Sequence, residues 1–191
     1  RAVLLLKRGD FRGALDDRAL ADFVLLTYLT RARLQFHAGQ ADAGLAALQL
    51  GRKLGQRQGL PRVSVTLAGE ECLWLCRLGD AQAARELARA QDFDRTMHAQ
   101  YGLVAEKAAR VAPRLLLGEQ PEMAIAQLGP ALVRATEQGF HHRHVELLIL
   151  HAAALLRAGR TGDALQSWRV ALDVGERFGY RRVFLVGPPF P

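Results

Sequence analysis

Several residue types that stabilise other fold classes are scarce in this sequence. Phe, Trp and Tyr make up only 7% of the 191 residues, while Ala, Leu and Gly dominate. A β-sandwich needs more β-branched and aromatic residues, so this composition favours closely packed helices. No apolar run approaches the roughly 18–20 residues of a membrane span, and no signal-peptide pattern opens the chain. We therefore expect a helical protein that does not interact with membranes.

Cysteine and lysine are also rare. The two cysteines, Cys72 and Cys76, lie one helical turn apart, where a disulfide bond is difficult to form. A reducing cytoplasm fits this usage best. Lysine occurs only at positions 7, 53 and 107, so the net charge of +7 comes almost entirely from arginines scattered along the chain. A dispersed arginine surface is unlike a patch that follows a phosphate backbone, and we expect no direct DNA contact.

Small residues recur at intervals of forty residues. Three registers show this period: Ala32, Cys72, Ala112 and Ala152; Gly44, Ala84, Ala124 and Ala164; and Gly51, Gln91, Ala131 and Ala171, which breaks only at Gln91. Turn glycines lie between the first two registers at Gly39, Gly79 and Gly159, with Gly118 one residue early. A period of this size is typical of a solenoid of stacked helical pairs. The small residues are expected where helices cross closely.

The period predicts an all-α fold, a right-handed superhelix of antiparallel helix pairs similar to tetratricopeptide repeats (TPR-like). We expect a single repeat domain over 1–191. Helix pairs are predicted at 20–59, 60–99, 100–139 and 140–179, after a partial pair at 1–19 and before a short terminal helix and tail at 180–191. Pro113 is expected to kink a helix. The second helix of the fourth pair is expected to pack one face that carries Ala164, Leu165, Trp168, Ala171, Leu172 and Val174.

Two stretches resemble a known family. Residues 31–34, Arg-Ala-Arg-Leu followed by Gly39, are similar to the central repeats of the large ATP-dependent LuxR-type (MalT-like) transcriptional activators. Residues 179–185, Gly-Tyr-Arg-Arg-Val-Phe-Leu, resemble the end of that family's final repeat, G-Y-x-R-x-F-L. The resemblance implies a cytoplasmic sensor domain that binds a small-molecule inducer, contacts the other domains of its parent regulator and supports self-association.

Other features of the sequence agree with a binding role. No G-x-x-x-x-G-K-[ST] phosphate loop occurs, and no helix-turn-helix follows the final repeat. We expect neither an enzyme nor a cofactor in this part of the regulator. The alternative function is a TPR-like scaffold module that binds a protein or peptide.

The concave face of such a solenoid is lined by the first helix of each pair. By register, the candidate ligand-binding residues on this face are Arg33, His37, Thr66, Trp74, Arg77, Glu106, His142, Glu146 and Arg157, with Arg62 and Arg143 near one rim. Arg, Glu and His suit a polar small molecule or a peptide held by charge-assisted hydrogen bonds. For each residue the alternative is a solvated inner face, and for Trp74 it is packing between repeats.

Three further clusters have structural explanations. The histidines at 141, 142 and 144 lack the i, i+4 spacing of helical metal ligands, so they indicate a solvated helix start rather than a metal site. Cys72 occupies a small-residue register and is expected to pack in the interior. The carboxylates on the first helices are expected to pair with arginines of neighbouring repeats: Glu70, Glu71, Glu106 and Glu146 with Arg31, Arg77, Arg110 or Arg157. No nucleophile accompanies them, so no catalytic residue is expected.

Overall fold

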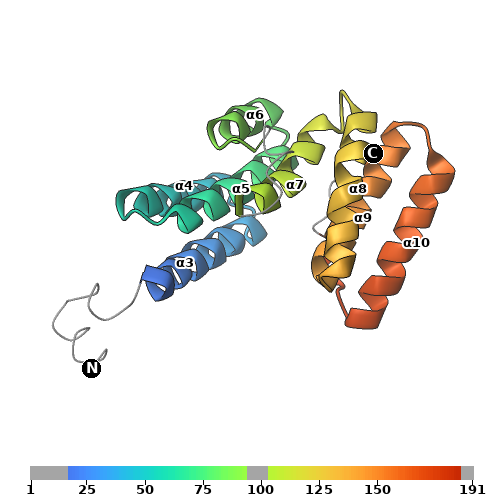
Figure 1. Cartoon of the computed structure of the whole chain (residues 1–191). Helices are drawn as coiled ribbons and strands as arrows, with labels where there is room; N and C mark the ends of the chain where they lie inside the picture. Colours follow the sequence, from blue (N-terminus) through green and yellow to red (C-terminus); the bar gives the residue numbers. More distant parts are fainter. Residues whose placement is uncertain (1–16, 94–102, 186–191) are drawn as a thin grey trace. The chain divides into compact units, whose positions relative to one another are not determined.

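The computed structural model describes residues 17–93 and 103–185, with the backbone alone at positions 17, 18, 103–106 and 185. All regular elements of this part are helices (Figure 1). They are α3 (Asp17–His37), α4 (Ala41–Arg57), α5 (Pro61–Leu78), α6 (Ala81–Ala90), α7 (Leu103–Leu116), α8 (Pro121–Glu137), α9 (His141–Arg157), α10 (Thr161–Phe178) and α11 (Arg182–Leu185). The prediction of an all-α protein is confirmed for these residues. None of the described helices is long and apolar enough to cross a membrane.

Two helices lie in each of the four predicted pair ranges, although α3 begins slightly earlier, at Asp17. The predicted partial pair at 1–19 and the tail after Leu185 lie largely outside the described residues. The chain divides into two compact units, Arg1–Trp74 and Leu75–Pro191, with the division inside α5. Each unit is described by itself below. The single superhelical domain and its forty-residue period stay predictions.

Glycines in the left-handed conformation follow most of these helices. Gly179 has a φ of 72° after α10, and the N–H of Tyr180 donates to the carbonyl oxygen of Gly175 at 2.8 Å. Glycine adopts this conformation without the steric cost that a Cβ would add, so the chain can reverse within a few residues. The predicted turn glycines take the same conformation: Gly39, Gly79 and Gly159. Gly118 does not have a positive φ, so the α7–α8 turn is built differently.

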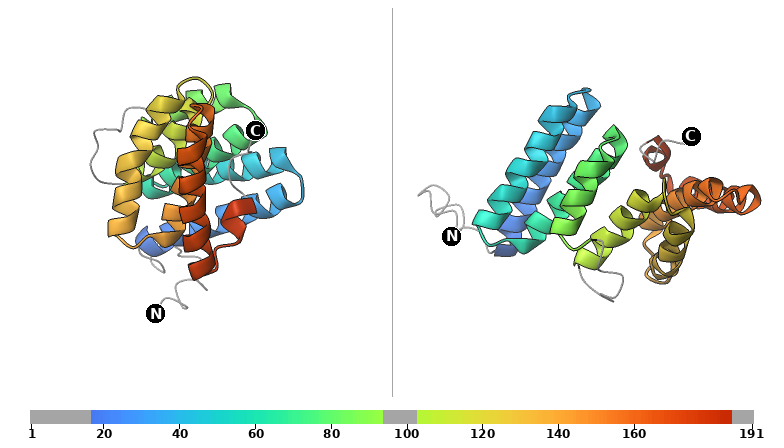
Figure 2. Two further views of the ribbon diagram at one scale, coloured as in Figure 1. Left: turned by 90° about the vertical axis from the view of Figure 1, so that its right-hand side faces the viewer. Right: turned by 90° about the horizontal axis from the view of Figure 1, so that it is seen from above.

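In the first unit, α3 and α4 lie side by side, and α4 also packs against α5 (Figure 2). A Cβ atom added at Gly51 of α4 would lie 2.6 Å from Cγ of Tyr28 and 2.7 Å from Cδ1 of Leu67. One added at Gly44 would lie 2.7 Å from the ring of Phe36. Glycine therefore sits where the side chains of α3 and α5 approach the backbone of α4, as the small-residue registers predicted.

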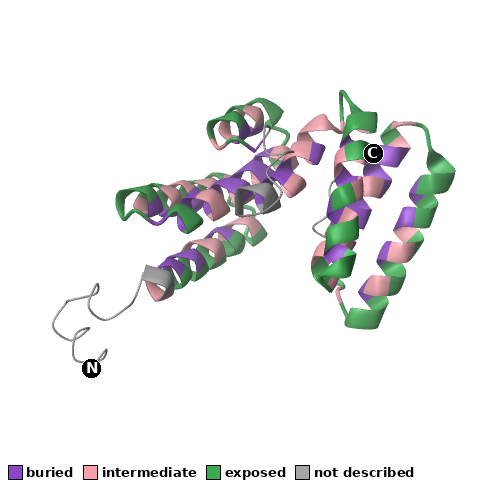
Figure 3. Ribbon diagram, viewed as in Figure 1, coloured by how far each residue is buried: buried purple, intermediate pink, exposed green. Residues whose placement is uncertain are grey.

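In the second unit, α9 is the most buried helix. It packs against α8 and α10 and also contacts α7 and α11. The buried positions of α10 lie on the side that faces α9 (Figure 3). Ala152 of α9 and Ala164 of α10 are both buried, as expected of crossing positions.

The prediction that Leu165 and Leu172 pack on the inner face of α10 was wrong, because both are exposed. The buried positions of this helix are Ala164, Ser167, Ala171 and Gly175. Only small side chains fit between α9 and α10 at this approach, so the neighbouring leucines lie outside it. Trp168 is partly buried and packs against the core of this unit.

Proline occurs inside two helices of the second unit. Pro113 lies within α7, as predicted, and the helix continues beyond it to Leu116. Pro130 lies within α8. Proline has no N–H to donate and its ring crowds the preceding turn, so each disturbs the backbone hydrogen bonding of its helix. Ala112, beside Pro113, is only half-buried, unlike the other members of its register.

Replacing Gly51 by Ala should destabilise the protein. The new methyl group would collide with Tyr28 and Leu67, and this overpacking should outweigh the better helix propensity of alanine, for a net loss of about 1–2 kcal/mol in the free energy of unfolding. Gly162→Ala, in the first turn of α10, is the matched control, because its Cβ meets nothing within 4 Å. Urea unfolding of both variants measures the difference. Equal stability of the two would contradict the close approach of α4 to its neighbours.

Candidate functional site

Charged side chains from three helices gather in the second unit. We call Arg77, Arg110, Arg114, Arg143 and Glu146 the arginine cluster. Arg77 lies at the end of α5, Arg110 and Arg114 lie on α7, and Arg143 and Glu146 lie on α9. Each of these helices is the first of a predicted pair, and α7 contacts α9 directly. The cluster is therefore the candidate site for a ligand bound by the first helices.

Glu146 forms ion pairs with two arginines of the cluster. Nη2 of Arg110 donates to Oε1 of Glu146 at 3.2 Å, and Nε of Arg143 lies 3.6 Å from Oε2. The exposed fractions of the side chains are 11% for Arg110, 18% for Glu146 and 26% for Arg143. The predicted pairing between a carboxylate and an arginine of neighbouring repeats is confirmed here. The low exposure means that these charges interact through less water than a surface pair does.

Arg114 is held by the backbone rather than by a carboxylate. Its Nη1 donates to the carbonyl oxygen of Arg110, one turn earlier, at 2.8 Å. Burial, together with the positive charges of Arg110 and Arg77 and against the opposing effect of Glu146, lowers the pKa of Arg114 to about 10. Like charges are thus held close together in a partly dehydrated place.

The thiol of Cys76 lies in the electrostatic field of this cluster. Burial raises its pKa, and the positive charges of Arg114, Arg77 and Arg85 act in the opposite direction. Because the net shift is upward, the thiol stays protonated near neutral pH and does not neutralise the arginines. Neither cysteine forms a disulfide bond, and Cys72 is fully buried in the position where packing was predicted.

The structure brings together only some of the residues that were predicted to bind a ligand. Arg77 and Glu146 belong to the arginine cluster. Glu106 lies on α7, with its side chain outside the described residues. His142 and Arg157, also in the second unit, are exposed. The other candidates belong to the first unit, where Arg33 and His37 are exposed and Thr66 and Trp74 are partly buried. The ring of Trp74 stacks on Phe36 with centroids 3.7 Å apart, so packing explains this residue.

Sequence analysis did not identify Arg114 as a site residue. Its register is shared by Leu34 and Trp74, and it shows no polar pattern. No pattern in the sequence distinguishes it, because the carbonyl group that its long side chain reaches depends on how the side chain lies along α7.

A buried charged group occurs in the first unit. The side chain of Glu71, on α5, is 4% exposed. Its carboxylate accepts hydrogen bonds from Nε of Arg52 and from Nε2 of Gln49, both at 3.0 Å and both on α4. Glu71 does pair with an arginine of a neighbouring repeat, but its partner is Arg52 on the second helix of the preceding pair, which is not among the predicted partners. This contact joins α4 and α5 and leaves no carboxylate oxygen open for chemistry.

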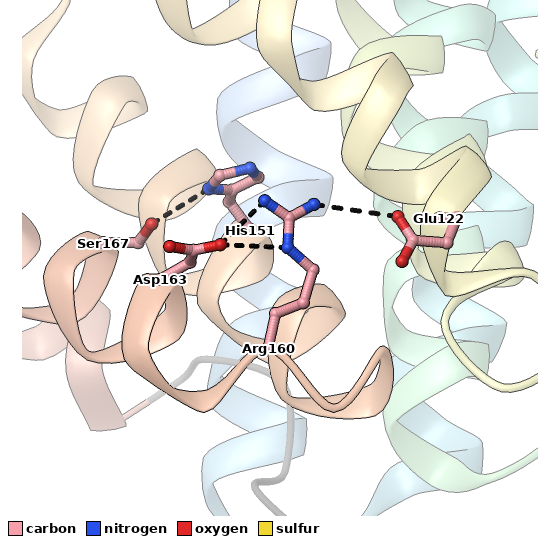
Figure 4. Close-up of polar contacts among 5 residues, drawn as sticks. All are labelled: Glu122, His151, Arg160, Asp163 and Ser167. Atoms are coloured by element: carbon pink, nitrogen blue, oxygen red, sulfur yellow. Dashed lines mark hydrogen bonds and ion pairs between the residues drawn. The ribbon is translucent and has the colours of Figure 1, made fainter.

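A second polar network links α8, α9 and α10 (Figure 4). Arg160 donates to Asp163 from Nη2 at 2.7 Å and from Nε at 3.0 Å, and its Nη1 lies 3.8 Å from Glu122. Nδ1 of His151 and Oγ of Ser167 share a hydrogen bond of 3.0 Å. Although serine beside histidine is also a catalytic pairing, Ser167 is buried inside a helix and Asp163 is engaged by Arg160 rather than by the imidazole. The network therefore serves to connect the helices.

Within the described residues, no group of three His, Cys, Asp or Glu side chains could hold a metal ion. Comparisons with protein-family models, with curated proteins and with solved structures found no match to this chain.

His151 should make the protein sensitive to mild acid. Burial lowers its pKa, and the charge of Arg160 lowers it further, with Asp163 opposing. The unfolded chain then binds more protons than the native state as the pH falls below about 6.5, so stability decreases in that range. His151→Gln should lose less stability than the wild type between pH 7 and pH 5 in urea unfolding. The same loss in both would contradict this assignment, and His37→Gln, at an exposed position, serves as the control.

Removing one partner of the buried pair should cost more than removing one partner of an exposed pair. Arg52→Met leaves the Glu71 carboxylate buried with only Gln49, which should lower the free energy of unfolding by about 3 kcal/mol. Arg62→Met breaks the exposed ion pair with Asp22 and should cost only about 0–1 kcal/mol. Calorimetry or urea unfolding distinguishes the two. Similar losses would show that Glu71 is not held as described.

Proposed function

We propose that this chain is a ligand-sensing and self-association repeat domain of a LuxR-type, MalT-like transcriptional regulator. Its ligand is an inducer bound on the concave face that the first helices of its pairs form. The arginine cluster carries the proposal, because three first helices contribute charged side chains to one half-buried place. Polar side chains gathered in this way suit a polar ligand better than they suit the core of a fold.

The contacts between helices support the repeat architecture. In the second unit, the helices in contact follow one another in sequence: α6 with α7, α7 with α8, α8 with α9 and α9 with α10. The contact of α7 with α9 joins the first helices of two successive pairs. A TPR-like right-handed superhelix with a forty-residue period has this pattern, since each repeat contacts only its neighbours.

The packing of the C-terminal segment supports the resemblance to the family. Residues 179–185 carry the G-Y-x-R-x-F-L pattern, and the side chains of Val183 and Phe184 close the last pair. Val183 is buried, and the ring of Phe184 meets Trp168 edge-on, with centroids 5.7 Å apart. A Cβ atom at Gly175 would lie 2.5 Å from Phe184, so this aromatic ring lies on the backbone of α10. The pattern thus has a physical role at the end of a repeat array.

The proposed role has consequences for partners and location. The domain would act in the cytoplasm, contact the other domains of its parent regulator and self-associate when the inducer binds. It would neither contact DNA directly nor catalyse a reaction, because its polar groups serve binding.

A scaffold that binds a helical peptide is the second candidate, and α3 favours it. Phe23, Leu26 and Leu34 are all strongly exposed, and their spacing places them along one side of this helix. An amphipathic partner helix could cover such a stripe with its own apolar face.

Mapping the binding site distinguishes the two functions. Polar metabolites would be screened by thermal shift on the whole chain, and the stabilising compound would be mapped by NMR chemical shifts. We expect the shifts to concentrate on α7, α9 and the end of α5. Arg110→Gln should weaken this binding by about tenfold, because a charge-assisted hydrogen bond is lost.

Phe23→Ser is the control for the metabolite and the test variant for the scaffold. It should leave metabolite binding unchanged and should abolish the binding of an apolar helical peptide if the scaffold function is correct. Shifts confined to α8 and α10, the second helices of their pairs, would refute the sensor proposal.

A further inference from the structure

We propose that the exposed side of α3 pairs with the same side of α3 from a second copy of this chain, in antiparallel orientation. This inference rests on the proposed function, because it names the surface through which the domain self-associates. The surface, which we call the α3 stripe, consists of Phe23, Leu26, Thr27, Thr30 and Leu34. The inference is carried by the spacing of these residues, by the hydrogen bonding of a central threonine and by the charges beside the stripe.

The large apolar side chains of the α3 stripe are open to solvent. Phe23, Leu26 and Leu34 are 64%, 69% and 64% exposed. Within the described residues, these fractions are higher than those of the other exposed large apolar side chains. Exposed apolar side chains that gather on one side of a helix, unlike scattered ones, mark an interaction surface.

The next first helix shows what covers this side of a helix. By the predicted period, Val63 of α5 corresponds to Phe23 of α3, and Val63 is fully buried. A Cβ atom added at Gly55 of α4 would lie 2.9 Å from Val63, so the backbone of a neighbouring helix covers this position. The partner of the α3 stripe is therefore expected to be a helix.

The spacing of the stripe fits a second copy of α3. Phe23, Thr27, Thr30 and Leu34 follow one another at intervals of four, three and four residues, which is the spacing of the seam between two coiled helices. When two copies run antiparallel, Phe23 of each lies opposite Leu34 of the other, and Thr27 lies opposite Thr30. Large side chains then meet at both ends and small ones meet at the centre. A two-fold interface requires such a pattern, because one surface has to serve both copies.

The hydrogen bonding of Thr27, at the centre of the stripe, is compatible with an apolar contact. Its Oγ1 donates to the carbonyl oxygen of Phe23, one turn earlier, at 2.8 Å. A hydroxyl group that already forms a hydrogen bond loses less when it is removed from water than one without a partner. A second helix can therefore cover Thr27 without leaving its hydroxyl group unsatisfied.

The charges beside the stripe favour the antiparallel orientation. Asp22 and Arg33 are both exposed and lie eleven residues apart, which is about three helical turns, so they share one flank of α3. In the antiparallel pair, Arg33 of each copy lies beside Asp22 of the other. A parallel pair would leave these two residues about 16 Å apart along the helix axis. Arg62 approaches Oδ1 of Asp22 at 2.8 Å on the surface, and Arg33 of the second copy would approach the other oxygen.

Sedimentation equilibrium of the whole chain tests the pairing. Because the α3 stripe is already exposed in this structure, the pairing is expected of the chain alone, without an added metabolite. The dissociation constant of the dimer should rise by at least about tenfold in Leu34→Ser, since each dimer loses the contact of Leu34 twice. Leu50→Ser, at an exposed position of α4, is the matched control and should change it less than about twofold. A chain that stays monomeric, or a dimer that both variants affect alike, would overturn the proposal.

Exchange of the two charges tests the antiparallel register. Arg33→Asp and Asp22→Arg should each raise the dissociation constant by about tenfold, because like charges then meet at both ends of the interface. The double variant re-forms both ion pairs with exchanged partners, so its dissociation constant should return to within about threefold of the wild type. A double variant as weak as the two single variants would show that Arg33 does not lie beside Asp22 of the second copy.

The outcomes separate this inference from the proposed function. Metabolite binding at the arginine cluster, in a chain that does not pair through α3, refutes the pairing and leaves the sensor function. Pairing through α3 without metabolite binding refutes the sensor function and leaves the pairing. A monomeric chain that binds an apolar helical peptide at the α3 stripe overturns the second copy as the partner and favours the scaffold function. Circular dichroism establishes that each variant keeps its helices, so that a loss of pairing is not mistaken for unfolding.

Discussion

The close approach of neighbouring helices is the constraint on which the rest of the structure depends. Glycine and alanine occupy the positions where one helix meets the backbone of another, as at Gly51 between α3 and α5 and at Ala164 between α9 and α10. A larger side chain at Gly51 would push three helices apart. Because dispersion contacts decay steeply with distance, separating the backbones would weaken the packing of every residue nearby, including those that face the core of the unit.

The close approach of the helices also determines how the charged residues pair and how far they are hydrated. Glu146 reaches an arginine of the neighbouring helix because α7 and α9 are in contact, and the short separation leaves these groups only partly hydrated. Arginine suits this setting better than lysine, since its guanidinium is more weakly hydrated and donates in fixed directions. The scarcity of lysine in the sequence therefore fits the use of basic residues inside helix interfaces as well as on the surface.

Periodic spacing was sufficient to predict where the helices lie and, with the exception of Ala112, which alanines of the registers are buried, because both depend on local geometry. The failure at Leu165 and Leu172 has a physical reason: spacing shows which residues share a face, but not how near the next helix comes to it. The hydrogen bond between His151 and Ser167 and the position of Arg114 were not predictable either. Both depend on where long side chains extend after residues from separate turns or helices have been brought together. Of the candidate site, Arg77 and Glu146 were found by their register, whereas no pattern in the sequence distinguishes Arg114.

The hydrogen bond of Arg114 has a further consequence. The guanidinium of Arg114 is attached to a main-chain oxygen, and a main-chain oxygen neither titrates nor exchanges its partner for a dissolved counterion. Concentrated electrolyte weakens the attraction between Arg110 and Glu146, and strong acid removes it by protonating the carboxylate. Neither treatment acts on the attachment of Arg114. One cation would thus keep its orientation under conditions in which its neighbours lose theirs, and the backbone of a single helical turn would preserve part of the electrostatic pattern.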